Sequence, residues 1–158
     1  MPRLLEHRIP PPLIDLGYAL LMWGLSVGVP AAQLWPRAGS LAVWGVAVGL
    51  ALLGAGIALA GVLAFRRART TVNPLAPQRA SQLVVVGIYR RTRNPMYLGM
   101  LLVLAGWGVY LGNALAFLAL PLFVLTLNRL QIKPEERALR ERFGEAYLSY
   151  MQRVRRWV

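Results

Sequence analysis

Long runs without a charged side chain constrain this chain more than any other feature. One run extends from Leu16 to Trp35 and a second from Leu41 to Phe65. Each meets the requirement of about 20 apolar residues for a helix that crosses a bilayer. The overall hydrophobic content of 57% is high for an ordinary soluble domain. The sequence therefore predicts an all-α integral membrane protein.

A third uncharged run, from Met96 to Asn128, is too long for one crossing. As a single helix it would reach about 50 Å, whereas the hydrocarbon core of a bilayer is about 30 Å thick. Gly112 and Asn113 lie near its middle and are residue types that accept a tight turn. We therefore predict that the run folds into a short helical hairpin. The prediction is a single domain, residues 1–158, with about four spans, at residues 13–35, 41–65, 96–111 and 114–132.

The charge distribution predicts the orientation in the membrane. The chain has 18 Lys and Arg residues against 6 Asp and Glu, a formal net charge of +12. Arg37 alone lies between the first two predicted spans, and the other basic residues precede the first span, separate the second from the third, or begin at the end of the fourth. Lys and Arg accumulate in cytoplasmic loops. We expect both termini in the cytoplasm, a bacterial inner membrane as the location, the bilayer as the partner, and no nucleic acid.

Two further expectations follow from composition. The chain has no cysteine, which excludes disulfides, thiolate metal sites and a cysteine nucleophile, and no metal site is predicted. Small residues let membrane helices approach closely. We therefore expect Gly24-x-x-x-Gly28 and Gly45-x-x-x-Gly49 to be helix contact faces. The oligomeric state stays open.

The basic stretch from Arg90 to Pro95 is a candidate site. A proline disfavours helical backbone at the residue before it. Irregular backbone at membrane depth occurs where it is buried in protein or lines a cavity. This stretch would then frame a site at the start of the third span. The alternative is a basic loop on lipid headgroups, with Pro95 as the first helical residue and Tyr89 and Tyr97 as interfacial aromatics.

A second candidate follows the fourth span. Pro134 suits the first turn of a helix, and Glu135 and Glu136 suit its positive end. We predict an amphipathic cytoplasmic helix over residues 134–157 that lies along the membrane or caps the bundle. Its apolar positions recur at helical spacing: Leu139, Phe143, Tyr147, Tyr150, Val154 and Trp157. The two glutamates would either compensate the helix dipole or bind hydroxyl or ammonium groups of a ligand.

These two segments carry a family resemblance. The first block is Leu83 to Gly87, Tyr89 and Arg93-Asn94-Pro95-x-Tyr97-x-Gly99, and the second is Glu135-Glu136-x-x-Leu139-x-x-x-Phe143-Gly144-x-x-Tyr147-x-x-Tyr150. In order and separation the blocks resemble the isoprenylcysteine carboxyl methyltransferase and phospholipid methyltransferase superfamily. The resemblance covers about the C-terminal half, and the first two spans match only in being hydrophobic.

The resemblance implies methyl transfer from S-adenosylmethionine, bound at the cytoplasmic end of the last two spans, to a lipophilic or small acceptor that enters from the bilayer. Arg93 would either bind the carboxylate of this cofactor through its guanidinium group or have a structural role. Glu136 is predicted to contact the cofactor together with Glu135. Aromatic faces and a carboxylate suit a sulfonium cation. By similarity, the cofactor contacts are Ser81, Gln82, Leu83, Val84, Tyr89, Asn94, Pro95, Met96, Tyr97 and Glu135.

The sequence departs from the family pattern at two positions. Asn94 stands where histidine is common, and an amide does not titrate near neutrality, so we assign no catalytic residue. An arginine associated with substrate aligns with Gln131, while Arg129 lies two residues earlier, so both are substrate candidates. The acceptor stays open between a prenylated carboxylate, a lipid amine and a thiol. The alternatives are a nicotinamide-dependent reductase related to sterol reductases and a non-catalytic membrane scaffold or sensor.

Overall fold

The computed structural model describes residues 9–37, 39–68 and 82–158, and within these ranges the protein is helical, without strands. Two helical stretches, Leu41–Arg67 and Ala114–Arg153, are long and apolar enough to cross a membrane. This confirms the predicted all-α class, while the count of four spans stays a prediction. The helices are α1 (Pro11–Gly28), α2 (Leu41–Arg67), α3 (Pro95–Leu111), α4 (Ala114–Leu127) and α5 (Lys133–Arg153), with the short turns η2 (Pro30–Ala32), η4 (Gly87–Arg90) and η5 (Asn128–Ile132).

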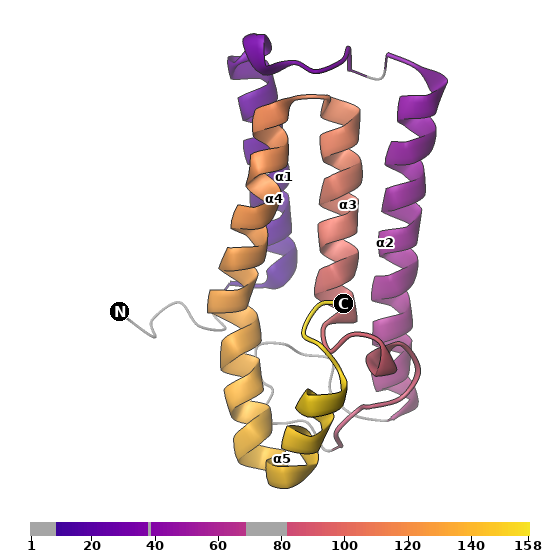
Figure 1. Ribbon diagram of the computed structural model, residues 1–158, viewed down its shortest axis with the longest axis vertical. Helices are drawn as coiled ribbons and strands as arrows, with labels where there is room; N and C mark the ends of the chain where they lie inside the picture. Colours follow the sequence, from indigo (N-terminus) through magenta and orange to yellow (C-terminus); the bar gives the residue numbers. More distant parts are fainter. Residues whose placement is uncertain (1–8, 38, 69–81) are drawn as a thin grey trace.

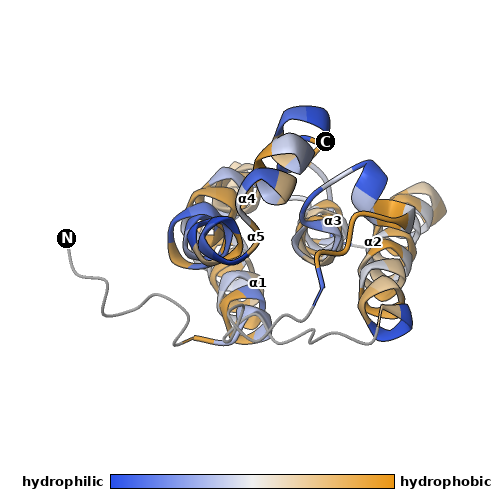
Figure 2. Ribbon diagram, turned by 90° about the horizontal axis from the view of Figure 1, so that it is seen from below, coloured by the Kyte–Doolittle hydropathy of each residue, from blue (hydrophilic) through white to orange (hydrophobic). Residues whose placement is uncertain are grey.

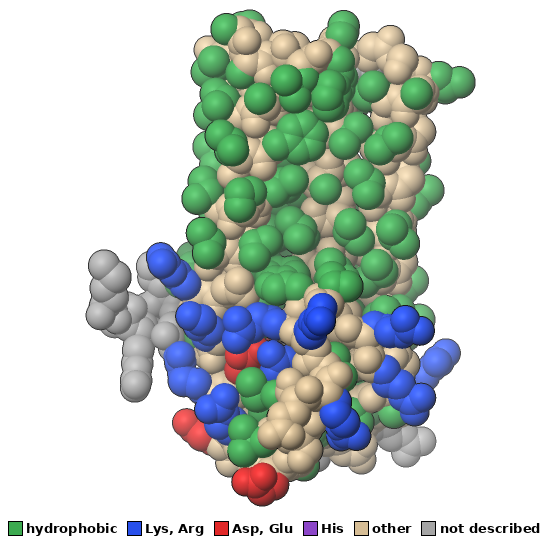
Figure 3. All heavy atoms as spheres, viewed as in Figure 1, with side chains coloured by type: hydrophobic (Ala, Val, Ile, Leu, Met, Phe, Trp, Pro, Cys, Tyr) green, Lys and Arg blue, Asp and Glu red, His purple; other side chains and the backbone are tan. Residues whose placement is uncertain are grey.

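The helices form a bundle in which α3 lies between α2 on one side and α1 and α4 on the other (Figures 1 and 2). Hydrophobic side chains cover most of the visible length of the bundle, and a band of Lys and Arg follows where they end (Figure 3). The band lies at the end of the bundle that carries η4, the start of α3 and α5. An apolar belt with a basic border is the surface of an integral membrane protein.

Glycines bring α2 and α3 together, but they are not the glycines predicted. A Cβ built on Gly54 would lie 2.5 Å from the carbonyl oxygen of Gly99, so only glycine allows this approach. The predicted contact faces at Gly24, Gly28, Gly45 and Gly49 are not helix contacts within the described chain, because a Cβ at any of them would meet none of the described residues within 4 Å. The buried face of α2 instead repeats every seven residues, at Ala47, Gly54 and Gly61.

The hairpin turn lies where the sequence predicts it. Gly112 takes a left-handed conformation with φ 63°, and the side chain of Asn113 accepts a hydrogen bond from the amide of Leu115 at the start of α4. The first connection packs on this turn: the Trp35 indole donates to the Val109 carbonyl oxygen (2.9 Å). Helix α1 ends at Gly28, earlier than the predicted residue 35, because Pro30 disfavours helical backbone at the preceding residue.

The segment after α4 differs from the prediction of a span that ends at residue 132 and a separate amphipathic helix over 134–157. Helix α4 continues through the π-helical turn η5 into α5 without interruption. This wider turn directly precedes Pro134, whose ring would clash with the carbonyl of residue 130 in a regular α-helix. The predicted helix over 134–157 is then broken at Gly144 (φ 51°, ψ −127°) and ends at Arg153. Beyond the break the chain folds back, and Tyr147 and Tyr150 pack in a cluster with residues on both sides of it.

Candidate functional site

A cavity lies at the basic end of the bundle, where the start of α3 meets α5. Its lining residues come from both sequence blocks, which are separated by the whole α3–α4 hairpin. With the open solvent at its mouth included, the space between the lining residues is about 630 Å³. The lining is Phe65, Gln82, Leu83, Val84, Tyr89, Arg93, Asn94, Met96, Tyr97, Glu135, Glu136, Leu139, Tyr147 and Tyr150.

The η4 turn presents Tyr89 to this cavity. Gly87, at the start of η4, has φ 62°, a conformation that favours glycine. Tyr89 is then buried against Phe65 of α2, with ring centroids 5.3 Å apart. The hydroxyl of Tyr150 donates to the Tyr89 carbonyl oxygen (2.7 Å). The end of α2 and the folded-back part of α5 thus fix one aromatic wall.

Tyr97 and Glu135 form the polar pair across the cavity. The Tyr97 hydroxyl donates to Glu135 Oε1 at 2.5 Å, linking the first turn of α3 to the first turn of α5. Burial raises the pKa of Glu135 to about 8, the hydrogen bond from Tyr97 lowers it, and the charge of Glu136 raises it. Glu135 therefore holds a proton near neutral pH, in a place where a nearby cation would favour its ionised form.

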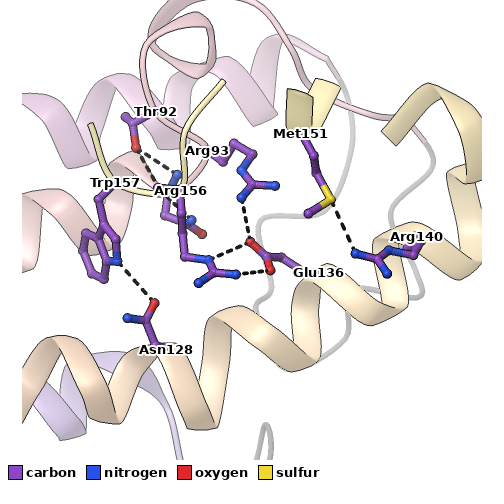
Figure 4. A network of polar contacts seen from close by, with 9 residues as sticks. Thr92, Arg93, Asn128, Glu136, Arg140, Met151, Arg156 and Trp157 are labelled. Carbon is purple, nitrogen blue, oxygen red and sulfur yellow. Dashed lines mark hydrogen bonds and ion pairs between the residues drawn. The ribbon is translucent and has the colours of Figure 1, made fainter. Parts of the chain in front are cut away.

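Glu136 has different partners from its neighbour. The Arg156 guanidinium donates two hydrogen bonds to the Glu136 carboxylate, from Nε to Oε1 (2.9 Å) and from Nη2 to Oε2 (2.7 Å) (Figure 4). Arg93 adds an ion pair from Nη2 to Oε1 (3.1 Å). Among the described residues, Nε and Nη1 of Arg93 have no hydrogen-bond partner although both atoms are buried. These two donors are available to an anionic group of a ligand.

Residues 154–158, after the end of α5, form a non-helical segment that we call the C-terminal strap. The amide of Arg93 donates to the Arg155 carbonyl oxygen (3.0 Å), and the side-chain amide of Asn94 donates to the Arg156 carbonyl oxygen (2.9 Å). The Trp157 indole donates to Asn128 Oδ1 (3.2 Å) (Figure 4). The strap therefore joins the stretch before α3 to the end of α4.

The structure brings most of the predicted site residues to the cavity. Pro95 is buried as the first residue of α3 and does not line the cavity, and Ser81 lies outside the described residues. The two substrate candidates also lie elsewhere. Arg129 is exposed, and Gln131 is fully buried, with its amide donating to the Ile9 carbonyl oxygen (2.7 Å).

Sequence reasoning did not include Phe65 or Arg156 in the site. Phe65 is one apolar residue at the end of a long apolar run, and Arg156 is one of several arginines near the C-terminus, so neither stood out. Leu139, Tyr147 and Tyr150 were visible as a periodic apolar pattern, and their place in the second block was the signal that could have assigned them to the cavity.

The fold and the cavity define an all-helical integral membrane protein with a polar and aromatic cavity at its basic edge. Residues 42–146 match the model of the phospholipid methyltransferase family, which is more than half of the chain. The chain belongs to this family.

Curated relatives agree with that assignment. An uncharacterized protein of Haemophilus influenzae is 48% identical over 63 residues, which are 40% of this chain and all of that protein. Protein-S-isoprenylcysteine O-methyltransferase B of Arabidopsis thaliana is 29% identical over 103 residues, 65% of this chain and 52% of the relative. A probable protein-S-isoprenylcysteine O-methyltransferase of Oryza sativa subsp. indica is 31% identical over 105 residues, 66% of this chain and 55% of the relative.

The chain thus spans about half the length of these plant relatives. No solved structure gives a significant match. The family match and the plant relatives confirm the resemblance to the isoprenylcysteine and phospholipid methyltransferase superfamily that the two blocks predicted.

Proposed function

We propose that this protein is a membrane methyltransferase that moves a methyl group from S-adenosylmethionine to a lipophilic or small acceptor. The observation that carries the proposal is the meeting of both sequence blocks around one cavity with aromatic walls, a carboxyl group and a partly unpaired arginine. Membership of the phospholipid methyltransferase family supports it. The same family and the names of the plant relatives do not favour the reductase alternative.

The donor set of the cavity fits this cofactor. S-adenosylmethionine carries a sulfonium cation, and the faces of Tyr89 and Tyr97 together with the carboxyl group of Glu135 are favourable neighbours for a cation. The cofactor also carries a carboxylate. Arg93 has two buried donors without a partner among the described residues, Nε and Nη1, and a hydrogen bond from either to a carboxylate would be charge-assisted.

The cofactor would supply an already activated methyl group, so the main task of the protein is alignment. Leu83, Val84 and Leu139 give the cavity apolar walls. Tyr97 and Glu135 hold the two helix starts together, and a bound cation would favour the ionised form of Glu135. We assign no general base.

The proposed setting is a bacterial inner membrane with four spans in one domain and both termini in the cytoplasm. All basic residues except Arg37 then lie on the cytoplasmic side. The charged cofactor would enter from the cytoplasm and the lipophilic acceptor from the bilayer. Arg129 and Gln131 stay predictions for the substrate, since neither lines the cavity.

Ligand binding to the protein purified in lipid nanodiscs tests the proposal. We expect binding of S-adenosylmethionine and of its product S-adenosylhomocysteine, measured by calorimetry. Arg93→Ala should weaken both, because it removes the two unpaired donors, whereas the matched variant Arg91→Ala, at an exposed neighbouring position, should not. Binding of reduced nicotinamide cofactor alone would favour the reductase, and binding of no cofactor would favour the scaffold.

A further inference from the structure

The C-terminal strap is bonded to the same residues that frame the cavity. Its backbone carbonyl oxygens accept hydrogen bonds from the Arg93 amide and from the Asn94 side chain, and the Thr92 hydroxyl donates to the Arg156 carbonyl oxygen (3.3 Å). Thr92 is buried, with 2% of its surface exposed. The backbone around Arg93 is therefore fixed by a segment more than 60 residues away in sequence.

The side chain of Arg156 also determines which other donors can bond to the Glu136 carboxylate. Both Glu136 oxygens accept hydrogen bonds from Arg156, so Arg93 reaches this carboxylate through Nη2 only. Without Arg156, the buried Glu136 carboxylate would form hydrogen bonds with other donors, because an unpaired buried charge is costly. The nearest guanidinium is that of Arg93, whose Nε and Nη1 have no partner among the described residues.

We propose that Arg156 and Glu136 are positioning residues: by occupying Glu136, Arg156 leaves Nε and Nη1 of Arg93 free to donate to the carboxylate of the cofactor. This inference rests on the proposed function. The two adjacent glutamates then have different roles. Glu135, bonded to Tyr97, is the neighbour of the cationic part of the ligand. Glu136 and the strap hold Arg93, which binds the anionic part.

Two ligands test the proposal, one with the amino-acid group of the cofactor, including its carboxylate, and one without it. S-adenosylhomocysteine has the amino-acid group, and methylthioadenosine lacks it. In Arg156→Ala we expect the affinity for S-adenosylhomocysteine to fall by about tenfold or more, the loss typical of one charge-assisted hydrogen bond. The affinity for methylthioadenosine should change by less than about twofold, because that ligand has no carboxylate for Arg93 to bind.

Matched variants separate this role from general loss of structure. Arg155→Ala removes the same charge from the preceding residue, whose side chain is exposed, and should leave both affinities unchanged. Arg156→Lys keeps the charge and should recover part of the affinity for S-adenosylhomocysteine. Equal losses for both ligands in Arg156→Ala, or no loss for either, would overturn the proposal while leaving the proposed function intact.

Hydrogen exchange of the Arg93 amide in the ligand-free protein gives a second readout. This amide is bonded to the strap, so its exchange should be faster in Arg156→Ala and unchanged in Arg155→Ala. Unchanged exchange in Arg156→Ala would contradict the coupling of the strap to Arg93. A wild-type protein that binds neither nucleoside would instead refute the proposed function, and with it the carboxylate role of Arg93.

Discussion

Glu135 and Glu136 are neighbours in sequence, yet their environments assign them to opposite tasks. Glu135 accepts a hydrogen bond from Tyr97 within the cavity. Glu136 accepts hydrogen bonds from Arg156 and forms an ion pair with Arg93. From the sequence, both were candidates either for dipole compensation or for ligand binding. The choice depends on where Arg156 lies, and no local pattern reveals that a residue after the end of α5 returns to its first turn.

Glu135→Gln tests the role of the carboxylate. The change removes a charge with little change of volume, so the fold should be retained. At pH 9, where Glu135 is ionised, we expect weaker binding of S-adenosylmethionine by roughly 1.5–3 kcal/mol, the range for a charge-assisted hydrogen bond. Glu141→Gln, at an exposed position on α5, is the control. Unchanged affinity in the folded variant would leave Glu135 with a structural role only.

The raised pKa of Glu135 predicts a pH dependence. If S-adenosylmethionine binds to the protein with Glu135 ionised, its affinity should rise about tenfold between pH 7 and pH 9. The ionised fraction of Glu135 rises from about one tenth to about nine tenths over this interval, around a pKa of about 8. The neutral thioether product should show a smaller rise, and Glu135→Gln should remove the difference between the two ligands. A pH-independent ratio of the two affinities would contradict a link to Glu135.

The same pKa has the opposite effect on folding. A carboxyl group whose pKa is higher in the folded than in the unfolded protein binds more protons when folded. Its contribution to the free energy of unfolding is greatest below the ordinary glutamate pKa of 4.5 and is lost as the pH rises through about 8. As the pH rises toward 8, ionisation of Glu135 should therefore strengthen binding of the cationic ligand and lower the free energy of unfolding.

At the scale of helices, the α2–α3 contact depends on glycines that face each other. A Cβ on Gly99 would lie 2.8 Å from the Cβ of Ala58, so Gly99→Ala should destabilise the protein by about 1–3 kcal/mol through overpacking. Gly49→Ala is the matched control on α2, since a Cβ there would meet no described residue within 4 Å. Thermal unfolding in detergent measures both. Equal stability of the two variants would contradict the close packing.

Helix periodicity explains which elements could be predicted. The apolar runs place α2 and the hairpin well. The length of the third run requires a turn, because one helix of that length exceeds the bilayer core, and the residue types of Gly112 and Asn113 place that turn. The spacing that predicted one helix over 134–157 is real, since its apolar residues do pack together. Gly144 changes their arrangement, and a glycine inside a periodic pattern does not reveal whether the helix passes through it or reverses there.

For the whole molecule, the basic band predicts orientation. A reporter fused after Val158 and one inserted after Arg67 should both report the cytoplasm, because cytoplasmic segments retain Lys and Arg. A reporter inserted between Gly112 and Asn113 should report the opposite side. Detection of the hairpin turn and the C-terminus on the same side would contradict the four-span arrangement.

The uninterrupted course from α4 to α5 makes the site sensitive to bilayer thickness. Helices that are longer or shorter than the local hydrocarbon core adjust by tilting. With no break between Ala114 and Phe143, a change of tilt in the apolar part must also move Glu135 relative to Tyr97, which belongs to another helix. In nanodiscs made from phosphatidylcholines of different acyl-chain length, the affinity for S-adenosylmethionine should therefore pass through a maximum at one thickness.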